Sequence, residues 1–470
     1  MQVRILGTIS VALVAMPAMA QQTGTIVGKV VGRNGQGLAN VRIEVSGNVL
    51  PQVRTVVTSP SGEYRVPFLP PGEYVLTYSH PEKATQKRPA SVVLNQTTTS
   101  NLTLVDTASA QVEVIGEKAP LLDTASTELK TSFSSEIISS LPVGHDYRDL
   151  VKLIPGVTYT EDAVRAPSAG GSGQDNVHQF DGVNVNLPFY GTMSSEPSGH
   201  DIDQVTVNKG GADATGFNRS AGYTINSVSK SGTNALAGEL IYQVIPDSLV
   251  AHRKYSSALV YDPKKTYTSL NVGGPLLKDR LFYFVSVYHP TVTQANQTNN
   301  FGPLPEFSSS RNEYFGKLTW APLQTLLIHA SYRDSKNTSN HSGYGSSTAP
   351  TVGDGAESKM KISTLEASWN VTANSFINFK TTNFILKSAD NPDYRSSVKP
   401  VYDVTTLDVS ALATQGQFTV PTRRTGTTAA ILAYNTFVTP LIAQYGWAQD
   451  PTGATGGGSV VGGYREINNQ

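Results

Sequence analysis

Residues 281–288 read Leu-Phe-Tyr-Phe-Val-Ser-Val-Tyr, a run of aromatic and β-branched residues that is typical of a β-strand. Alternating segments of this kind recur after residue 235, separated by turns or long polar loops: residues 239–244, 314–320, 326–332, 363–370 and 376–386. Such a series is typical of a membrane β-barrel with one face towards lipid and the other towards a wet lumen. Strands of water-soluble β-sandwiches alternate in the same way, so the pattern favours a barrel without excluding a sandwich.

The composition limits the classes of function. The chain has 470 residues, 39% hydrophobic and 15% charged, which suffices for roughly three domains at ~150 residues each. Lys plus Arg and Asp plus Glu are equal at 36 each, so there is no basic excess with which to bind nucleic acid. Cys is absent, which excludes disulfides, thiolate metal sites and cysteine nucleophiles.

The first twenty residues have the features of a signal peptide. Arg4 precedes the apolar run Ile5 to Ala15, and Ala18-Met19-Ala20 supplies small residues at the cleavage positions. The run is too short for the ~20 residues of a spanning helix. We therefore predict export for this chain, with residues 1–20 as the signal peptide.

Short alternating strands separated by specific turns occupy residues 24–105, for example Val41 to Val45. Ser59-Pro60-Ser61-Gly62 leads into a strand at Glu63, and Leu69-Pro70-Pro71-Gly72 leads into another at Glu73. This pattern predicts a small antiparallel sandwich. The two turns and the tyrosines that follow them resemble the transthyretin-like, carboxypeptidase regulatory-type domain. That resemblance implies a non-enzymatic module that packs or docks.

Residues 106–129 differ in character and are predicted to connect two domains. Within them Val112, Glu113, Val114, Ile115 and Gly116 form a short apolar segment between polar residues and Pro120. An extended segment with a free edge is what a partner needs to recruit the chain by strand addition. The same residues could equally be the first strand of the next domain.

Residues 130–234 are predicted to form an α+β domain. Apolar spacing predicts short helices at residues 134–141 and 147–154, ended by Pro142 and by Pro155-Gly156. Strand-like segments follow in a Gly-rich context at residues 180–184, 202–208 and 223–230.

No catalytic, cofactor or metal site is predicted. His145, His178 and His200 are scattered, with no H-E-x-x-H or G-x-S-x-G motif around them. The acidic residues lack the spacing of a calcium loop, and turn aspartates are usually structural, so we expect structural roles for Asp175, Asp181, Asp201 and Asp203. Phe189 and Tyr190 are candidates for ligand contact at the exposed end of this domain.

Four motifs, in order, resemble TonB-dependent receptors. Residues 140–157 are similar to the start of the plug domain of that family, and residues 180–184 to its Asp-Gly-Val-Asn turn. Residues 202–234 are similar to the end of the plug, and residues 271–282 to an early barrel hairpin. Together with the N-terminal sandwich, this order resembles the Oar-like branch of the family. The turn at residues 216–222 and the pair His145-Asp146 depart from the usual motifs.

The resemblance implies a mainly β protein of the bacterial outer membrane, with its N-terminal domain in the periplasm. It implies a plug at 130–234 and the start of a transmembrane antiparallel β-barrel at 235–470, surrounded by outer-membrane lipid. It also implies energy-coupled uptake of a small ligand such as a siderophore, glycan or peptide, driven by a periplasmic TonB-type protein that pulls a segment such as 112–116. No enzymatic activity is expected.

The remaining length is short for this family. A barrel of about 22 strands at ~10 residues each, plus loops, needs far more residues than 235–470 provide, so we expect an N-terminal fragment with an incomplete barrel. Two other classes share the strand richness and the signal peptide. One is a surface adhesion or glycan-binding protein built of β-sandwiches, and the other is a passive pore.

Overall fold

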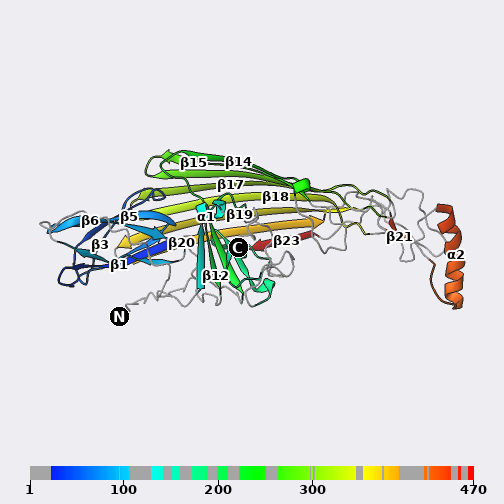
Figure 1. Ribbon diagram of the computed structural model, residues 1–470, viewed down its shortest axis with the longest axis horizontal. Coiled ribbons are helices and arrows are strands. Elements are labelled where there is room, and N and C mark those ends of the chain that lie inside the picture. Colours follow the sequence, from blue (N-terminus) through cyan, green and yellow to red (C-terminus); the bar gives the residue numbers. More distant parts are fainter. Residues whose placement is uncertain are drawn as a thin grey trace, which may run out of the picture. The chain divides into compact units, whose positions relative to one another are not determined.

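The computed structural model describes residues 23–94, 96–105, 129–140, 151–158, 171–187, 198–209, 222–249, 263–296, 298–299, 302–345, 353–372, 375–390, 418–420, 423–445, 454–456 and 464–469 (Figure 1). By its internal contacts the chain divides into two compact units. The first comprises Met1–Gly47, Thr55–Pro197 and Ile202–Ser229. The second comprises Asn48–Arg54, Ser198–Asp201 and Lys230–Gln470.

The first unit begins with a β-sandwich of two small sheets. One sheet has the order β4-β1-β7, with β8 also paired to β1, and the other has the order β3-β2-β5-β6. The strands are β1 (Gly24–Gly32), β2 (Arg42–Ser46), β3 (Arg54–Val57), β4 (Glu63–Leu69), β5 (Gly72–His80), β6 (Lys83–Val92), β7 (Thr97–Thr99) and β8 (Leu102–Leu104). The strands predicted from alternation at residues 41–45, 63–66 and 73–78 lie at β2, β4 and β5.

The sandwich core contains aliphatic residues and a pair of buried tyrosines. Ile26, Ile43 and Leu76 are fully buried. The hydroxyls of Tyr64 and Tyr78 lie 2.7 Å apart, and the Tyr64 hydroxyl also donates to the Ser100 carbonyl at 2.6 Å. Buried hydroxyl groups need such partners, so this network fixes how the two sheets meet.

The second part of this unit is a five-stranded sheet with the order β11-β10-β13-β12-β9. Its strands are β9 (Leu129–Ser134), β10 (Val177–Phe180), β11 (Val183–Asn184), β12 (Ile202–Lys209) and β13 (Tyr223–Ser229). The first predicted helix is present as α1 (Ser135–Ser140). In the described part of the second predicted helix, residues 151–153 form a 3₁₀ turn rather than an α-helix. There the Ile154 amide donates to the Val151 carbonyl, three residues back, just before Pro155-Gly156 ends the turn.

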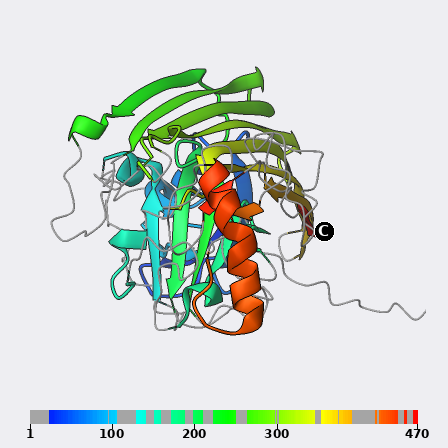
Figure 2. The same ribbon diagram turned by 90° about the vertical axis from the view of Figure 1, so that its right-hand side faces the viewer.

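The second unit is dominated by an eight-stranded antiparallel sheet with the order β14-β15-β16-β17-β18-β19-β20-β23. Figure 2 shows the sheet curving along this order. The strands are β14 (Ala237–Ile245), β15 (Lys264–Leu277), β16 (Leu281–Gln294), β17 (Phe307–Leu323), β18 (Leu326–Ser342), β19 (Asp354–Thr372), β20 (Ser375–Asp390) and β23 (Tyr464–Asn469). Every strand predicted after residue 235 lies inside one of these. The mainly β prediction is confirmed, and the sheet ends at β14 and β23 without closing, as expected of part of a barrel.

The two faces of this sheet differ in polarity, because one exposes apolar side chains and the other buries charged and polar ones together with apolar ones. In β17 the side chains of Glu313, Lys317 and Thr319 are buried, whereas Leu318 and Trp320, which alternate with Lys317 and Thr319, are 45% and 46% exposed. β15, β16, β18 and β19 also combine exposed apolar with buried polar residues, and the buried face holds aromatic and aliphatic side chains as well, among them Phe282, Phe284, Ile362 and Phe384. Exposed apolar residues include Leu240, Tyr242, Leu270, Val285, Val287, Tyr314, Tyr332, Leu365, Trp369, Ile377 and Phe379. Buried polar residues include Ser269, Asn271, Ser286, His329, Arg333, Ser335, Thr364, Glu366 and Ser368.

Beyond β20 the described part of the second unit contains the helix α2 (Ala429–Tyr445) and the short pair β21 (Phe418–Val420) and β22 (Ala454–Gly456). Among the described residues, no helix has the length and apolar character needed to cross a membrane.

Candidate functional site

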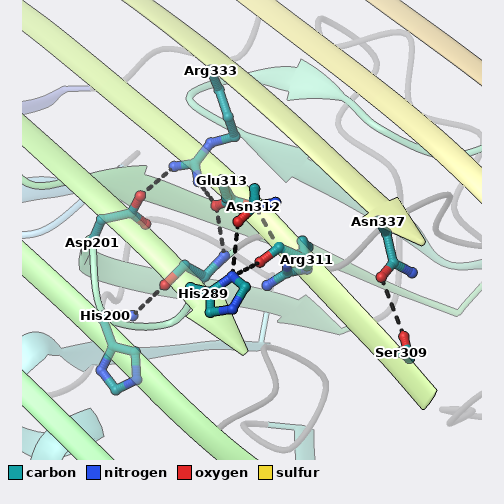
Figure 3. Close-up of polar contacts among 10 residues, drawn as sticks. His200, Asp201, His289, Ser309, Arg311, Asn312, Glu313, Arg333 and Asn337 are labelled. Carbon is teal, nitrogen blue, oxygen red and sulfur yellow. Dashed lines mark hydrogen bonds and ion pairs between the residues drawn. The ribbon is translucent and has the colours of Figure 1, made fainter. Parts of the chain in front are cut away.

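A cluster of buried charges lies on the polar face of the eight-stranded sheet, centred on Arg333 of β18 (Figure 3). Phe315 of β17 is paired with Arg333 in register, and the guanidinium carbon lies 4.5 Å from the centre of its ring. Glu313, two residues earlier on the same face of β17, forms an ion pair with Arg333. Period-two alternation therefore places an aromatic ring and a carboxylate around the guanidinium, where both can orient it.

The second carboxylate comes from residues 198–201, which we call the seated segment. In sequence it lies between β11 and β12, but by its contacts it belongs to the second unit. Asp201 Oδ2 lies 2.7 Å from an Arg333 terminal nitrogen, and each side chain is 1% exposed. A guanidinium that bridges two carboxylates makes charge-assisted hydrogen bonds, which are stronger than neutral ones.

Four adjacent strands hold the seated segment. The Ser198 amide donates to Glu313 Oε1 at 3.2 Å, and the Asn271 side-chain amide of β15 donates to the His200 carbonyl at 3.2 Å. The His200 ring lies 5.6 Å from that of Tyr288 on β16. A four-residue peptide is thus fixed by backbone and side-chain contacts to β15, β16, β17 and β18, which makes its position on the sheet specific.

The cluster is balanced in charge. Arg311 lies 3.7 Å from Glu313 and 4.9 Å from the centre of the Tyr288 ring, so two guanidiniums face the carboxylates of Glu313 and Asp201. Its backbone carbonyl accepts from His289, whose ring also contacts Asn312 (Figure 3). Opposite charges can be buried together when they pair with one another. Removal of one of them leaves an uncompensated buried charge, which is unfavourable.

A second polar group lies on the same face, closer to the turn between β17 and β18. Lys380 and Glu366 are 3.6 Å apart, with side chains 4% and 0% exposed. The hydroxyl of Thr319 lies 3.1 Å from His329 Nδ1. Buried polar groups therefore occur on this face beyond the Arg333 cluster, as they do in the lumen of a barrel.

The described His and Asp residues that were considered from the sequence do not come together in one site. Asp175 accepts from the Ser172 amide at 2.9 Å in a helix cap. Asp181 accepts from the amide and hydroxyl of Ser229 at 2.9 and 2.7 Å. His178 contacts Asn186, and only His200 and Asp201 belong to the cluster described above. Within the described ranges no group of His, Asp and Glu is arranged to hold a metal ion.

Asp203 lies on β12, and other candidates lie outside the described residues. These are the proposed partner-binding segment, Val112 to Gly116, the proposed ligand contacts Phe189 and Tyr190, and His145. Sequence reasoning missed Glu313 and Arg333 altogether. The available signal was their charge at positions that alternate with exposed apolar residues, Glu313 before Tyr314 and Arg333 after Tyr332.

Comparisons with known proteins agree with the motifs. Residues 25–105 match the family model of the carboxypeptidase regulatory-like domain. Over 301 residues the chain is 29% identical to the TonB-dependent transporter Oar of Myxococcus xanthus, a match covering 60% of this chain and 28% of that protein. The chain thus spans less than a third of the length of this curated relative.

Solved structures that resemble the chain include a siderophore receptor and an outer membrane transporter. The siderophore receptor PirA from Acinetobacter baumannii is 18% identical with a TM-score of 0.43, covering 57% of this chain and 41% of that one. The outer membrane transporter YddB from Escherichia coli is 17% identical with a TM-score of 0.47, covering 59% and 42%. The chain is therefore similar to the carboxypeptidase regulatory-like domain over residues 25–105 and, over 301 residues, to the TonB-dependent transporter Oar.

Proposed function

We propose that this chain is the N-terminal part of an outer-membrane transporter that takes up a small ligand with energy supplied by a periplasmic TonB-type protein. In this proposal residues 24–105 are a periplasmic domain, 106–129 a linker, 130–234 a plug and 235–470 the first part of a barrel. Transport, and no enzymatic step, is the activity of the whole protein.

The observation that carries the proposal is the exposed apolar face of the eight-stranded sheet, which lies opposite a face with buried charges. Exposed Leu318 and Trp320 alternate with buried Glu313, Lys317 and Thr319, which suits lipid on one side and a hydrated interior on the other. A soluble adhesion protein would have the opposite arrangement, with apolar residues inside. Sequence similarity to a TonB-dependent transporter agrees with this preference.

The seated segment supplies a gating element in this proposal. It continues directly into β12 of the five-stranded sheet, and its Asp201 is bound to the wall through Arg333. Moving Asp201 away would leave a charge in a site with little solvent, so the contact resists small displacements and gives way only to a substantial force. A pull on the linker would supply that force.

Deletion of residues 112–116 from the full-length protein tests the coupling. We expect ligand to bind to cells as before and uptake to stop, because strand addition to this segment would transmit the pull through backbone hydrogen bonds. Uptake that continues at the normal rate would exclude the segment. Collapse of the proton gradient should have the same effect in the unmodified protein, whereas a passive pore would continue to admit the ligand.

Growth experiments identify the ligand class. A deletion strain compared on iron, glycan and peptide sources should fail on one of them. Alanine variants of Phe189 and Tyr190 should then weaken binding of that ligand on the cell surface, since these residues are proposed to touch it. Solubility without detergent distinguishes the transporter from the adhesion alternative. A secreted array of sandwiches stays in solution without detergent, whereas a membrane barrel needs it.

A further inference from the structure

Within the first unit, the sandwich contacts the edge of the five-stranded sheet. The backbone amide of Leu94, which follows β6, donates to the side-chain oxygen of Gln204 on β12 at 2.6 Å. Leu94 is fully buried and Gln204 is 8% exposed. The Gln96 side chain lies 3.4 Å from the Ser132 hydroxyl on β9, which in turn lies 3.1 Å from that of Thr206. Two residues of the sandwich therefore meet the two strands at this edge.

This contact uses the polar face of the sheet. Pairing in register puts Ser132 beside Thr206, and Thr206 beside Asn226 of β13. On the opposite face Phe133 pairs with Val205, and both are buried. One face of the sheet is thus apolar and buried. The other face carries hydroxyl and amide groups and contacts the sandwich.

Asn226 gives this polar face a further property. It is 4% exposed, and neither its side-chain nitrogen nor its oxygen has a hydrogen-bond partner among the described residues. A buried amide without partners is unfavourable, and access of water would satisfy it. Opening this polar face to water is therefore not strongly unfavourable.

We propose that the carboxypeptidase regulatory-like domain is a releasable clamp on this polar face, attached through Leu94 and Gln96 to Gln204, Ser132 and Thr206. Its partner is thus a segment of the same chain. Polar contacts exchange readily for contacts with water, so an interface held by them can separate, as transient interfaces between domains do.

The order of the chain indicates when the clamp would open. Residues 105–128 join β8 of the sandwich to β9, the edge strand that the sandwich contacts. A pull on this connector acts on both sides of the contact at once, and we infer that it separates the sandwich from β9 before it disturbs the rest of the sheet. This step rests on the proposed function, whereas the docking itself does not.

Hydrogen exchange tests the docking in the full-length protein in membranes. Gln204→Leu removes the acceptor, so exchange of the Leu94 amide should accelerate by roughly tenfold, as expected for loss of one hydrogen bond. The Ser100 amide, which donates to the Val27 carbonyl inside the sandwich, should be unchanged and shows that the domain is folded. Gln36→Leu, in an exposed turn of the same domain, is the matched control. Unaltered exchange at Leu94 in Gln204→Leu would overturn the docking.

Cross-linking tests the release. Because the chain has no cysteine, Gln96→Cys combined with Ser132→Cys gives a single reactive pair for a short bis-maleimide. We expect efficient cross-linking at rest, unchanged binding of ligand at the surface and loss of uptake, with each single variant transporting normally. Failure of the pair to cross-link, or full uptake by the cross-linked protein, would overturn the clamp. Absence of uptake in the unmodified protein would instead reject the proposed transport function.

Discussion

Arg333 and Asp201, 132 residues apart in sequence, form an ion pair of 2.7 Å in which each side chain is only 1% exposed. Glu313 completes the pairing from the neighbouring strand. The relationship ties the segment that precedes β12 to the polar face of the eight-stranded sheet. Its consequences can be measured directly.

Arg333→Met should destabilise the second unit strongly. The substitution leaves the carboxylates of Asp201 and Glu313 buried without their shared partner, which typically costs about 3–5 kcal/mol. Urea unfolding in detergent, followed by the fluorescence of Trp320 and Trp369 on β17 and β19, would measure the loss. Lys336→Met is the control, since Lys336 pairs with Glu357 at 3.0 Å where the side chains are 46% and 31% exposed. Equal effects of the two variants would contradict a special role for the buried pair.

Combining Asp201→Asn with Arg333→Met should give less than the sum of the single effects. Once the guanidinium is gone, neutralising Asp201 removes one of the uncompensated charges and so recovers stability. Groups in direct contact show coupling energies of about 0.5–3 kcal/mol in such double-mutant cycles. Additive effects would show that the two side chains do not interact in the folded protein.

The sandwich should lose stability at alkaline pH. Burial raises the pKa of both Tyr64 and Tyr78 above the ordinary value of 10.0. Above pH 10.0 the unfolded chain releases these protons while the folded domain retains them, so the free energy of unfolding falls as pH rises towards the folded pKa. The slope is at most about 1.4 kcal/mol per pH unit for each tyrosine. Urea-dependent proteolysis within residues 24–105, measured from neutral to alkaline pH, would show it.

Tyr64→Phe separates this effect from general alkaline damage. The variant loses one titrating group and should show a shallower decline with pH. At neutral pH it should be less stable by about 0.5–1.5 kcal/mol, because the hydrogen bond to the Ser100 carbonyl is lost. A decline as steep as that of the unmodified domain would exclude Tyr64 as its source.

Strand positions could be predicted from the sequence where one face is apolar, but strand ends could not. Residues 363–370 alternate clearly, yet β19 extends over Asp354–Thr372. The missed ends are rich in Ser, Lys and Asn, as at the end of β18, and such residues carry no hydrophobic period although their backbones pair in register. Hydrogen bonding between strands fixes these ends, and a single sequence does not display it.

The cluster around Arg333 was beyond sequence reasoning for a different reason. Asp201 belongs to a short turn-like segment that reads as structural, and nothing near it in sequence indicates a cationic partner 132 residues away. Glu313 and Arg333 lie on strands that were predicted, but the pairing of β17 with β18 decides that both reach the same point. Local patterns give the face on which a side chain lies, whereas its partner depends on register and on the returning chain.

Gly62→Ala should destabilise the sandwich more than Gly35→Ala. Both glycines have positive φ, 81° and 75°, so alanine is strained at either position by about 1–2 kcal/mol. At Gly62 an added Cβ would also lie 2.3 Å from the Val30 carbonyl oxygen, whereas at Gly35 nothing lies within 4 Å. The difference between the two variants in urea-dependent proteolysis isolates this steric clash. Indistinguishable variants would mean that the turn relaxes around the methyl group.

Arginine substitutions on two equally exposed apolar residues test which surface faces lipid. Leu318 on β17 is 45% exposed and Val57 on β3 of the sandwich is 47% exposed. Because the two side chains are exposed to nearly the same extent, the comparison tests whether lipid or water surrounds them. Facing a bilayer, arginine at Leu318 should destabilise the folded protein by up to about 2–4 kcal/mol, the most near the midplane. Facing water, arginine at Val57 should change stability by less than about 0.5 kcal/mol. Urea unfolding of both variants in lipid vesicles measures the difference. A Leu318→Arg protein as stable as Val57→Arg would place the apolar face of β17 outside the membrane.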